Sequence, residues 1–149
     1  MAKAKTGGFE FFDAAGANGS QIAFDQANAA GGVNGCQIKV LWEDTKSDPA
    51  QGQQAAQNLI DQGAQVIILP SDFDLGAPAS LAAQKAGIFA VSPEASSPDW
   101  PKAAGPYTLV QALTTVDNGK GQAGFANQQA WGSTYIVTNE AFNFFKEME

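Results

Sequence analysis

QIAFDQANAAGGVNGCQIKVLWEDTKSDP, residues 21–49, contains a helix, a strand and the start of a second helix in close succession. Apolar residues recur at spacings of three and four in its first part, which predicts a helix over about 20–30. The pair Gly31-Gly32 ends this helix, because glycine readily adopts the left-handed conformation of a helix C-cap. A strand is then predicted at 38–42.

The turn 44–49 opens the second helix. Ser47 or Asp48 caps it, and Pro49 stands in its first turn, where a backbone N–H has no partner to lose. The same alternation continues to the end of the chain. Strands are predicted at 65–69, 88–91, 107–110 and 134–137, helices at 49–62, 77–86, 118–131 and 141–148, and loops at 6–19 and 92–106. This order predicts βαβ units on a parallel sheet, with helices on both faces and the strand 65–69 buried on both sides.

Size and composition limit the possible functions. The chain has 149 residues, 44% of them apolar, which fits one domain with a core of its own. Its eight basic residues against fifteen acidic ones leave a net charge of −7, so nucleic acid and anionic membranes are unsuitable partners. There is no histidine and a single cysteine, so no transition-metal site and no cofactor are expected.

Four motifs belong together. They are NAAGGVNG at 28–35, DTKSDP at 44–49, VSPEASSP at 91–98 and GPYTL at 105–109. In this order they resemble the first lobe of type I periplasmic solute-binding proteins, in the branched-chain amino-acid-binding group of ABC transporters. The similarity covers nearly the whole chain.

The resemblance implies an α/β fold, a flavodoxin-like three-layer sandwich with a parallel sheet. Residues 1–149 are then one domain, in which 133–149 correspond to the start of a second lobe. The implied function is reversible binding of a small amino-acid-like or amide-like solute, followed by docking on an ABC transporter in the membrane. Such proteins are periplasmic and are not enzymes. An isolated lobe is expected to bind its solute weakly or not at all, because the second lobe buries much of the ligand.

The chain departs from this family at both ends. Residues 1–5 have a basic start without the apolar stretch of a signal peptide, and the family's apolar first strand is not recognisable. In the strand order 2-1-3-4-5 that strand is central, so its slot is predicted to be vacant. We expect Tyr135–Val137 to fill the slot, within the chain or in a homodimer swapped through Thr134–Met148. The dimer is favoured because Phe142, Phe144 and Phe145 need cover from water.

Ligands of open α/β sheets bind beyond the carboxyl ends of the strands, where three loops of this chain are predicted to meet. The resemblance implies that backbone N–H groups near 70–76 and a hydroxyl near 92–97 hold the polar end of the solute. The residues expected to face the ligand are Phe11, Phe12, Asp72, Phe73, Glu94 and Ser96.

Each of these assignments has a structural alternative. Asp72 and Asp74 would repel a ligand carboxylate, so either the ligand has a cationic end or these acids cap helices. The Phe residues either stack on an apolar ligand or pack in the core.

Other functions fit the sequence less well. The serines lack a histidine partner that would make a nucleophile, so no enzyme is expected. GKGQAG at 119–124 matches the dinucleotide-binding spacing but does not follow a strand directly. The alternative to solute binding is an isolated or engineered half-domain with a structural, self-associating role.

Overall fold

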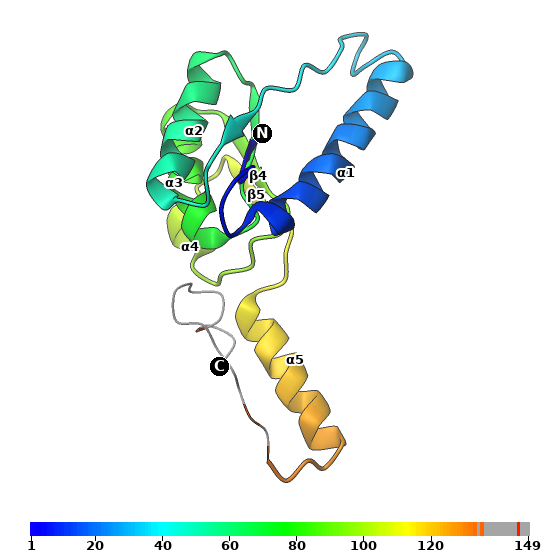
Figure 1. Cartoon of the computed structure of the whole chain (residues 1–149), viewed down its shortest axis with the longest axis vertical. Helices are drawn as coiled ribbons and strands as arrows, with labels where there is room; N and C mark the ends of the chain where they lie inside the picture. The colour runs from blue at the N-terminus through cyan, green and yellow to red at the C-terminus, as the bar shows by residue number, and fades with distance from the viewer. Residues whose placement is uncertain (134, 136–145, 147–149) are drawn as a thin grey trace.

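The computed structural model describes residues 1–133, 135 and 146, and its elements alternate between strands and helices (Figure 1). The strands are β1 (Ala2–Lys3), β2 (Glu43–Asp44), β3 (Val66–Ile68), β4 (Phe89–Ser92) and β5 (Thr108–Val110). The helices are α1 (Glu10–Ala29), α2 (Pro49–Asp61), α3 (Phe73–Lys85), α4 (Trp100–Ala103) and α5 (Thr115–Gln128). In the described part of the chain, none of these helices has the length and apolar content that a membrane crossing needs.

All paired strands run parallel, as the alternation of elements predicts. β4 lies between β3 and β5, with Ala90 opposite Ile67 on one side and Thr108 on the other. β1 pairs with β2 through Ala2 opposite Glu43, and β1 also contacts β3. The strand order is therefore 2-1-3-4-5, with the hydrogen-bonded ladder interrupted between β1 and β3. This is the flavodoxin-like order.

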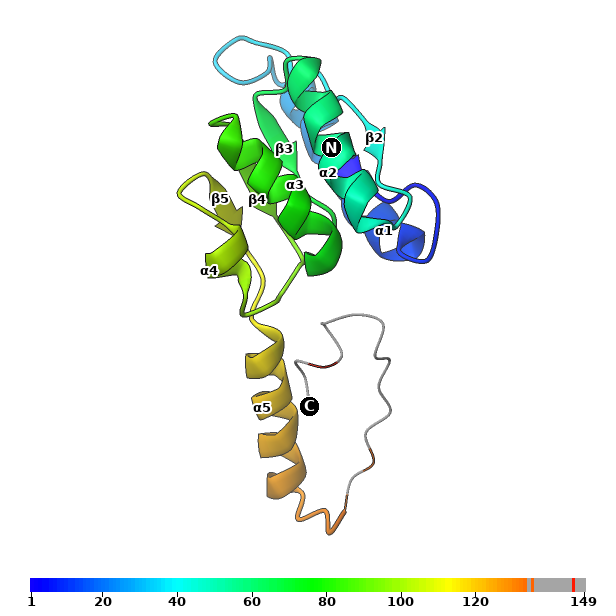
Figure 2. The ribbon, with the colours of Figure 1, turned by 90° about the vertical axis from the view of Figure 1, so that its left-hand side faces the viewer.

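The core lies between the sheet and two helices, α2 and α3, which cover the same face (Figure 2). α2 begins as predicted: the Asp48 side chain accepts from Gln51 N at 3.0 Å. The two helices approach closely at Gly52, where an added Cβ would lie 2.5 Å from the Leu75 carbonyl oxygen. Beneath them the sheet contributes apolar side chains with no exposed area, such as Ile67 and Leu69.

The opposite face of the sheet is open. Val66, Phe89 and Leu109 point away from α2 and α3 and are 52%, 42% and 47% exposed. The prediction that strand 65–69 is buried on both sides is therefore wrong for Val66. Helix α1 diverges from this face (Figure 1). A groove of about 610 Å³ lies between them, lined by Phe24 of α1 and by Val66 and Ile68 of β3.

Several predicted boundaries are wrong. Residues 10–19, predicted as loop, form the first half of α1, because Gly16 and Gly19 weaken a helix without stopping it. α3 begins at Phe73 rather than Ala77, since Asp72 caps it. Residues 38–42, predicted as a strand, are not part of a strand; β2 forms directly after them at Glu43–Asp44, opposite the two residues of β1.

The prediction that the central strand position of the sheet is vacant is also wrong. Residues 1–3 occupy it: Ala2 and Lys3 pair with β2, and Glu43 N donates to Met1 O at 3.1 Å. A polar strand was not recognised there because its lysine is neutralised by a distant residue. The strand and helix predicted at 134–137 and 141–148 fall, apart from Tyr135 and Lys146, outside the described residues.

Candidate ligand-binding site

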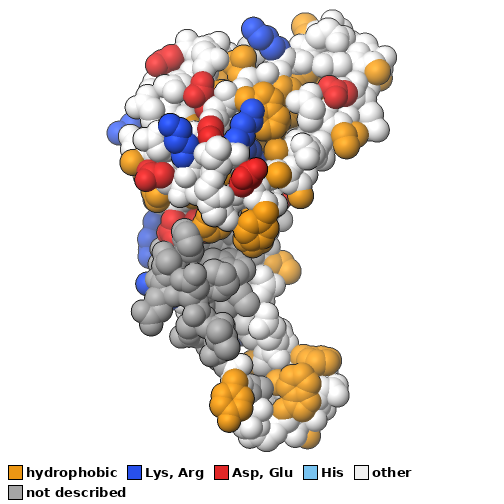
Figure 3. Space-filling model, viewed as in Figure 1, with side chains coloured by type: hydrophobic (Ala, Val, Ile, Leu, Met, Phe, Trp, Pro, Cys, Tyr) orange, Lys and Arg blue, Asp and Glu red, His pale blue; other side chains and the backbone are white. Residues whose placement is uncertain are grey.

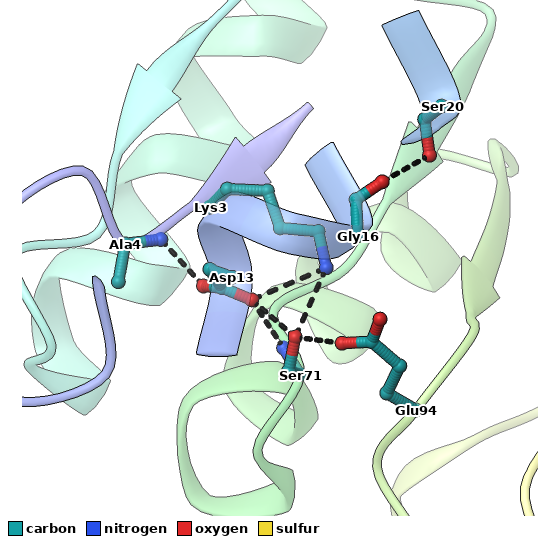
Figure 4. Close-up of polar contacts among 7 residues, drawn as sticks. All are labelled: Lys3, Ala4, Asp13, Gly16, Ser20, Ser71 and Glu94. Carbon is teal, nitrogen blue, oxygen red and sulfur yellow. Dashed lines mark hydrogen bonds and ion pairs between the residues drawn. The ribbon is translucent and has the colours of Figure 1, made fainter. Parts of the chain in front are cut away.

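Side chains from four elements meet at the carboxyl end of the sheet (Figure 4). Lys3 comes from β1 and Asp13 from the first turns of α1. Ser71 follows β3, and Glu94 follows β4. Parallel strands place these ends at one edge, so residues 91 positions apart in the chain are brought together there.

Asp13 is the centre of this cluster. Its carboxylate accepts from Lys3 Nζ at 3.2 Å, from Ala4 N at 2.5 Å and from Ser71 N at 2.8 Å. The Ser71 hydroxyl lies 2.5 Å from the same carboxylate. Lys3 and Asp13 form an ion pair in which each side chain is 1% exposed. Buried charges of this kind are tolerated only when paired and hydrogen-bonded, so the cluster fixes β1, α1 and the loop after β3 relative to one another.

The outer part of the cluster is open to solvent. Ser71 Oγ contacts Glu94 Oε2, and Glu94 is exposed. The Glu94 carboxylate also lies against α1, where a Cβ added to Gly16 would clash with it. The polar pair Ser71 and Glu94 therefore lies on the solvent side of the buried ion pair Lys3–Asp13.

The turn 44–47 sets the entry to α1. Asp44 accepts from Lys5 N and Thr6 Oγ1, both at 2.8 Å. Ser47 Oγ donates to Thr6 O at 2.9 Å and accepts from Phe9 N at 3.0 Å. The DTKSDP motif thus holds the loop that leads into α1, in addition to capping α2.

The predicted site residues are only partly brought together. Glu94 lies in the cluster. Asp72 instead caps α3, accepting from Asp74 N at 2.9 Å and Leu75 N at 3.4 Å, which is the alternative the sequence left open. Burial, and then the charge of Asp74, raises the pKa of Asp72 to about 6.

The aromatic residues also differ in their surroundings. Phe73 packs edge-on against Trp100, with ring centroids 5.1 Å apart, and so belongs largely to the core. Phe11 and Phe12 are 69% and 51% exposed and lie in contact, with ring centroids 4.0 Å apart. Ser96 is 8% exposed, and its carbonyl accepts from Thr115 N.

Sequence reasoning missed Lys3, Asp13 and Ser71 as site residues. One signal was available for Asp13, an acid in what became the first turn of a helix. Lys3, which stands between the alanines Ala2 and Ala4, could have indicated a buried partner. The residues GKGQAG lie inside α5 rather than between a strand and a helix, so they do not form a phosphate loop. No group of three metal-ligating side chains occurs among the residues described.

Comparison with known proteins identifies the family. A family model described as periplasmic binding protein matches residues 1–148. The chain is 31% identical over 85 residues to the Leu/Ile/Val-binding protein BraC3 of Rhizobium johnstonii, covering 57% of this chain and 23% of that protein. It is 27% identical over 103 residues to a leucine-, isoleucine-, valine-, threonine- and alanine-binding protein of Pseudomonas aeruginosa, covering 69% and 27%.

The fold also matches solved structures of substrate-binding proteins. The branched-chain amino-acid transporter substrate-binding protein LivJ of Streptococcus pneumoniae, in complex with isoleucine, superimposes with a TM-score of 0.82 at 28% identity. That match covers 86% of this chain and 37% of LivJ. A periplasmic binding protein of Burkholderia mallei shares the fold with a TM-score of 0.80 at 20% identity, over 99% of this chain and 39% of that one.

The chain spans about a quarter of the length of the curated relatives it matches. The family is periplasmic, and its members bind small solutes for ABC transporters rather than catalyse reactions. The family model, the relatives and the shared lobe lead to one conclusion: this chain belongs to the periplasmic binding proteins of type I, in the branched-chain amino-acid group.

Proposed function

We propose that residues 1–149 form the first, ligand-holding lobe of a substrate-binding protein that delivers a small amino-acid-like or amide-like solute to an ABC importer. The observation that carries this proposal is the convergence of Lys3, Asp13, Ser71 and Glu94 at the carboxyl edge of the sheet. This is where open α/β sheets bind ligands. Relatives named as leucine-, isoleucine- and valine-binding proteins favour an amino acid as the solute.

The ligand-facing rim consists of Ser71 and Glu94, flanked by Phe11 and Phe12. The two rings are exposed on α1 and offer an apolar surface of the kind that an aliphatic side chain covers. Asp72, Phe73 and Ser96 support the rim from behind, since Asp72 and Ser96 are buried and Phe73 packs on Trp100.

We expect residues 1–149 by themselves to bind the solute weakly, because the described residues form one wall of the site and a pocket normally encloses most of its ligand. The test is a titration of the ¹⁵N-labelled chain with a panel of amino acids and their amides. The proposal predicts shifts of the Ser71 and Glu94 amide signals. Shifts confined to the opposite edge of the sheet, near Asn34 and Gly63, would contradict it.

A second candidate function is self-association. The open sheet face exposes Val66, Phe89 and Leu109 together, and an apolar face of this kind favours an interface. Sedimentation of the native chain tests it. A monomer at all concentrations rules it out.

A further inference from the structure

The dipeptide Asn-Gly occurs three times in the chain, in two different kinds of backbone. One copy, residues 18–19, lies in the middle of α1, and another, residues 118–119, lies in the first turns of α5. The third copy, Asn34-Gly35, forms the turn 33–36 beyond the end of α1. All three asparagines are exposed, so access to water does not distinguish them, and any difference between them comes from the backbone.

The turn 33–36 is closed by two backbone hydrogen bonds between its end residues. Val33 N donates to Cys36 O at 2.8 Å, and Cys36 N donates to Val33 O at 3.0 Å. Asn34 and Gly35 have φ values of 51° and 80°, which is the left-handed pair of a type I′ turn. The Gly35 N–H takes part in neither bond, and no described residue accepts from it. A Cβ added to Gly35 would meet nothing within 4 Å, so this nitrogen is unhindered.

An asparagine followed by such a nitrogen is able to cyclise. Gly35 N forms a bond to Asn34 Cγ, the Cγ–Nδ2 bond breaks, and ammonia leaves with the proton of the attacking nitrogen. Water then opens the cyclic imide at one of its two carbonyl carbons, which leaves an aspartate or an isoaspartate. In sum, an amide and a water become a carboxylate and an ammonium ion, and no enzyme, oxidant or cofactor takes part.

The two helical pairs are protected from this reaction. In an α-helix the N–H of Gly19 or Gly119 donates to the carbonyl four residues earlier, so it cannot turn toward the asparagine side chain without breaking the helix there. Both helices are also anchored close to these pairs. Asp13 holds the first turns of α1, and Thr115 N donates to Ser96 O at 2.7 Å at the start of α5.

We propose that Asn34 is a site of spontaneous deamidation, and that the fold selects it over Asn18 and Asn118. The turn lies at the edge of the sheet opposite the proposed solute site, so the inference does not depend on the proposed function. The reaction adds one negative charge to a chain whose net charge is already −7.

The isoaspartate product changes the shape of the turn as well. Its backbone runs through the former side chain and is one carbon longer, so the two hydrogen bonds between Val33 and Cys36 no longer fit. The turn has no slack to absorb this carbon, because a Cβ added to Gly32 would lie 2.0 Å from Cys36 O. Val33 and Cys36 line the groove between α1 and the sheet, so deamidation alters one end of that groove.

The experiment incubates the whole chain at mildly alkaline pH and follows each asparagine by peptide mass spectrometry with fragmentation. A parallel sample in urea reports the three pairs without their helices. In the native chain Asn34 should react more than about tenfold faster than Asn18 and Asn118, because opening a short exposed turn costs less than local unfolding of a helix. In urea the three rates should be similar.

Variants and spectra make the assignment specific. Asn34→Gln should abolish the reaction at the turn, because a glutamine would have to close a larger ring, which is far slower. Asn18→Gln is the matched control and should leave the rate at Asn34 unchanged. In ¹⁵N-detected spectra the aged native chain should show new amide signals for Val33 and Cys36, and aged Asn34→Gln should show none.

Two results would overturn the inference. If Asn18 or Asn118 reacts as fast as Asn34 in the native chain, or if Asn34 stays intact while the sample in urea reacts, the fold does not select this asparagine. If Asn34 is converted but the signals of Val33 and Cys36 stay in place, the proposed change of the groove is wrong.

Discussion

The buried ion pair between Lys3 and Asp13 makes an asymmetric prediction for stability. Asp13→Ala removes the acceptor for Lys3 Nζ, Ala4 N and Ser71 N, at 3.2, 2.5 and 2.8 Å. It leaves an ammonium group whose side chain is 1% exposed without its charged partner. Removing one partner of a buried pair costs about 3–5 kcal/mol, so we expect a loss of that size.

Lys3→Met removes the other partner and should cost less. The Asp13 carboxylate then keeps the donors Ala4 N, Ser71 N and Ser71 Oγ. The methionine fills most of the lysine's volume with apolar atoms. We expect a loss of about 1.5–3 kcal/mol, that of one hydrogen bond to a charged group. The double variant should lose less than the sum of the single losses, because no unpaired ammonium remains.

Urea unfolding followed by far-UV circular dichroism measures these losses, provided that the slope against urea stays that of the native chain. Lys120→Met and Asp61→Ala are matched controls at exposed positions and should stay within about 0.5 kcal/mol of the native chain. The reasoning is refuted if Lys3→Met costs as much as Asp13→Ala, or if Asp13→Ala costs less than about 1 kcal/mol.

Three further changes have defined outcomes. Burial and the charge of Asp74 raise the pKa of Asp72 from 3.8 to about 6 on folding. The folded chain therefore binds this proton more tightly than the unfolded chain does. As a result, the free energy of unfolding falls as pH rises from 3.8 to about 6. Asp72→Asn, which can still cap α3, should remove the contribution of Asp72 to the decrease of the urea midpoint with rising pH. If the midpoint decreases with pH as steeply as in the native chain, Asp72 is not its cause. Gly16→Ala should stabilise α1 by up to about 1 kcal/mol and so raise the melting temperature, because the exposed Glu94 side chain can move aside. A lower melting temperature would show that Glu94 cannot yield. Asp48→Ala should cost about 1 kcal/mol in urea unfolding through loss of the α2 cap, and a neutral result would mean that water replaces it.

Elements defined by local signals could be predicted from the sequence. Asp48 and Pro49 locate the start of α2 to the residue, because a cap and a first-turn proline act on their own neighbours. The apolar runs of β3 and β4 are found within one or two residues for the same reason. The parallel order then follows from the helices between them.

Features that depend on distant partners could not be predicted. Lys3 is acceptable in a central strand only because Asp13 lies beside it, and that contact forms through the tertiary fold. The start of α1 was missed since Gly16 and Gly19 lower local helix propensity, whereas the contacts of Asp13 with β1 and Ser71 hold the helix. The role of Ser71 was equally invisible, because its neighbours in space are far away in the sequence.

Helix α1 is fixed near the ligand site and extends away from the sheet, so a movement at its base is carried along the whole helix. The helix is fixed at its first turns by Asp13, whereas Ile22 further along is 59% exposed. Asn28 near its far end holds the following segment through two hydrogen bonds with Ile38.

A small change at the base of α1 is therefore magnified at its tip. Ala29 lies about 24 Å from Asp13 along the helix axis, so a tilt of about 5° at the base moves the tip by about 2 Å. The free, exposed thiol of Cys36 lies just beyond that tip. In space-filling view the side of the molecule that carries α1 forms a projection continuous with the body of the domain (Figure 3). A fluorophore attached to Cys36 would turn the lobe into an optical sensor, in which occupancy beside Glu94 is reported from the opposite end of a lever.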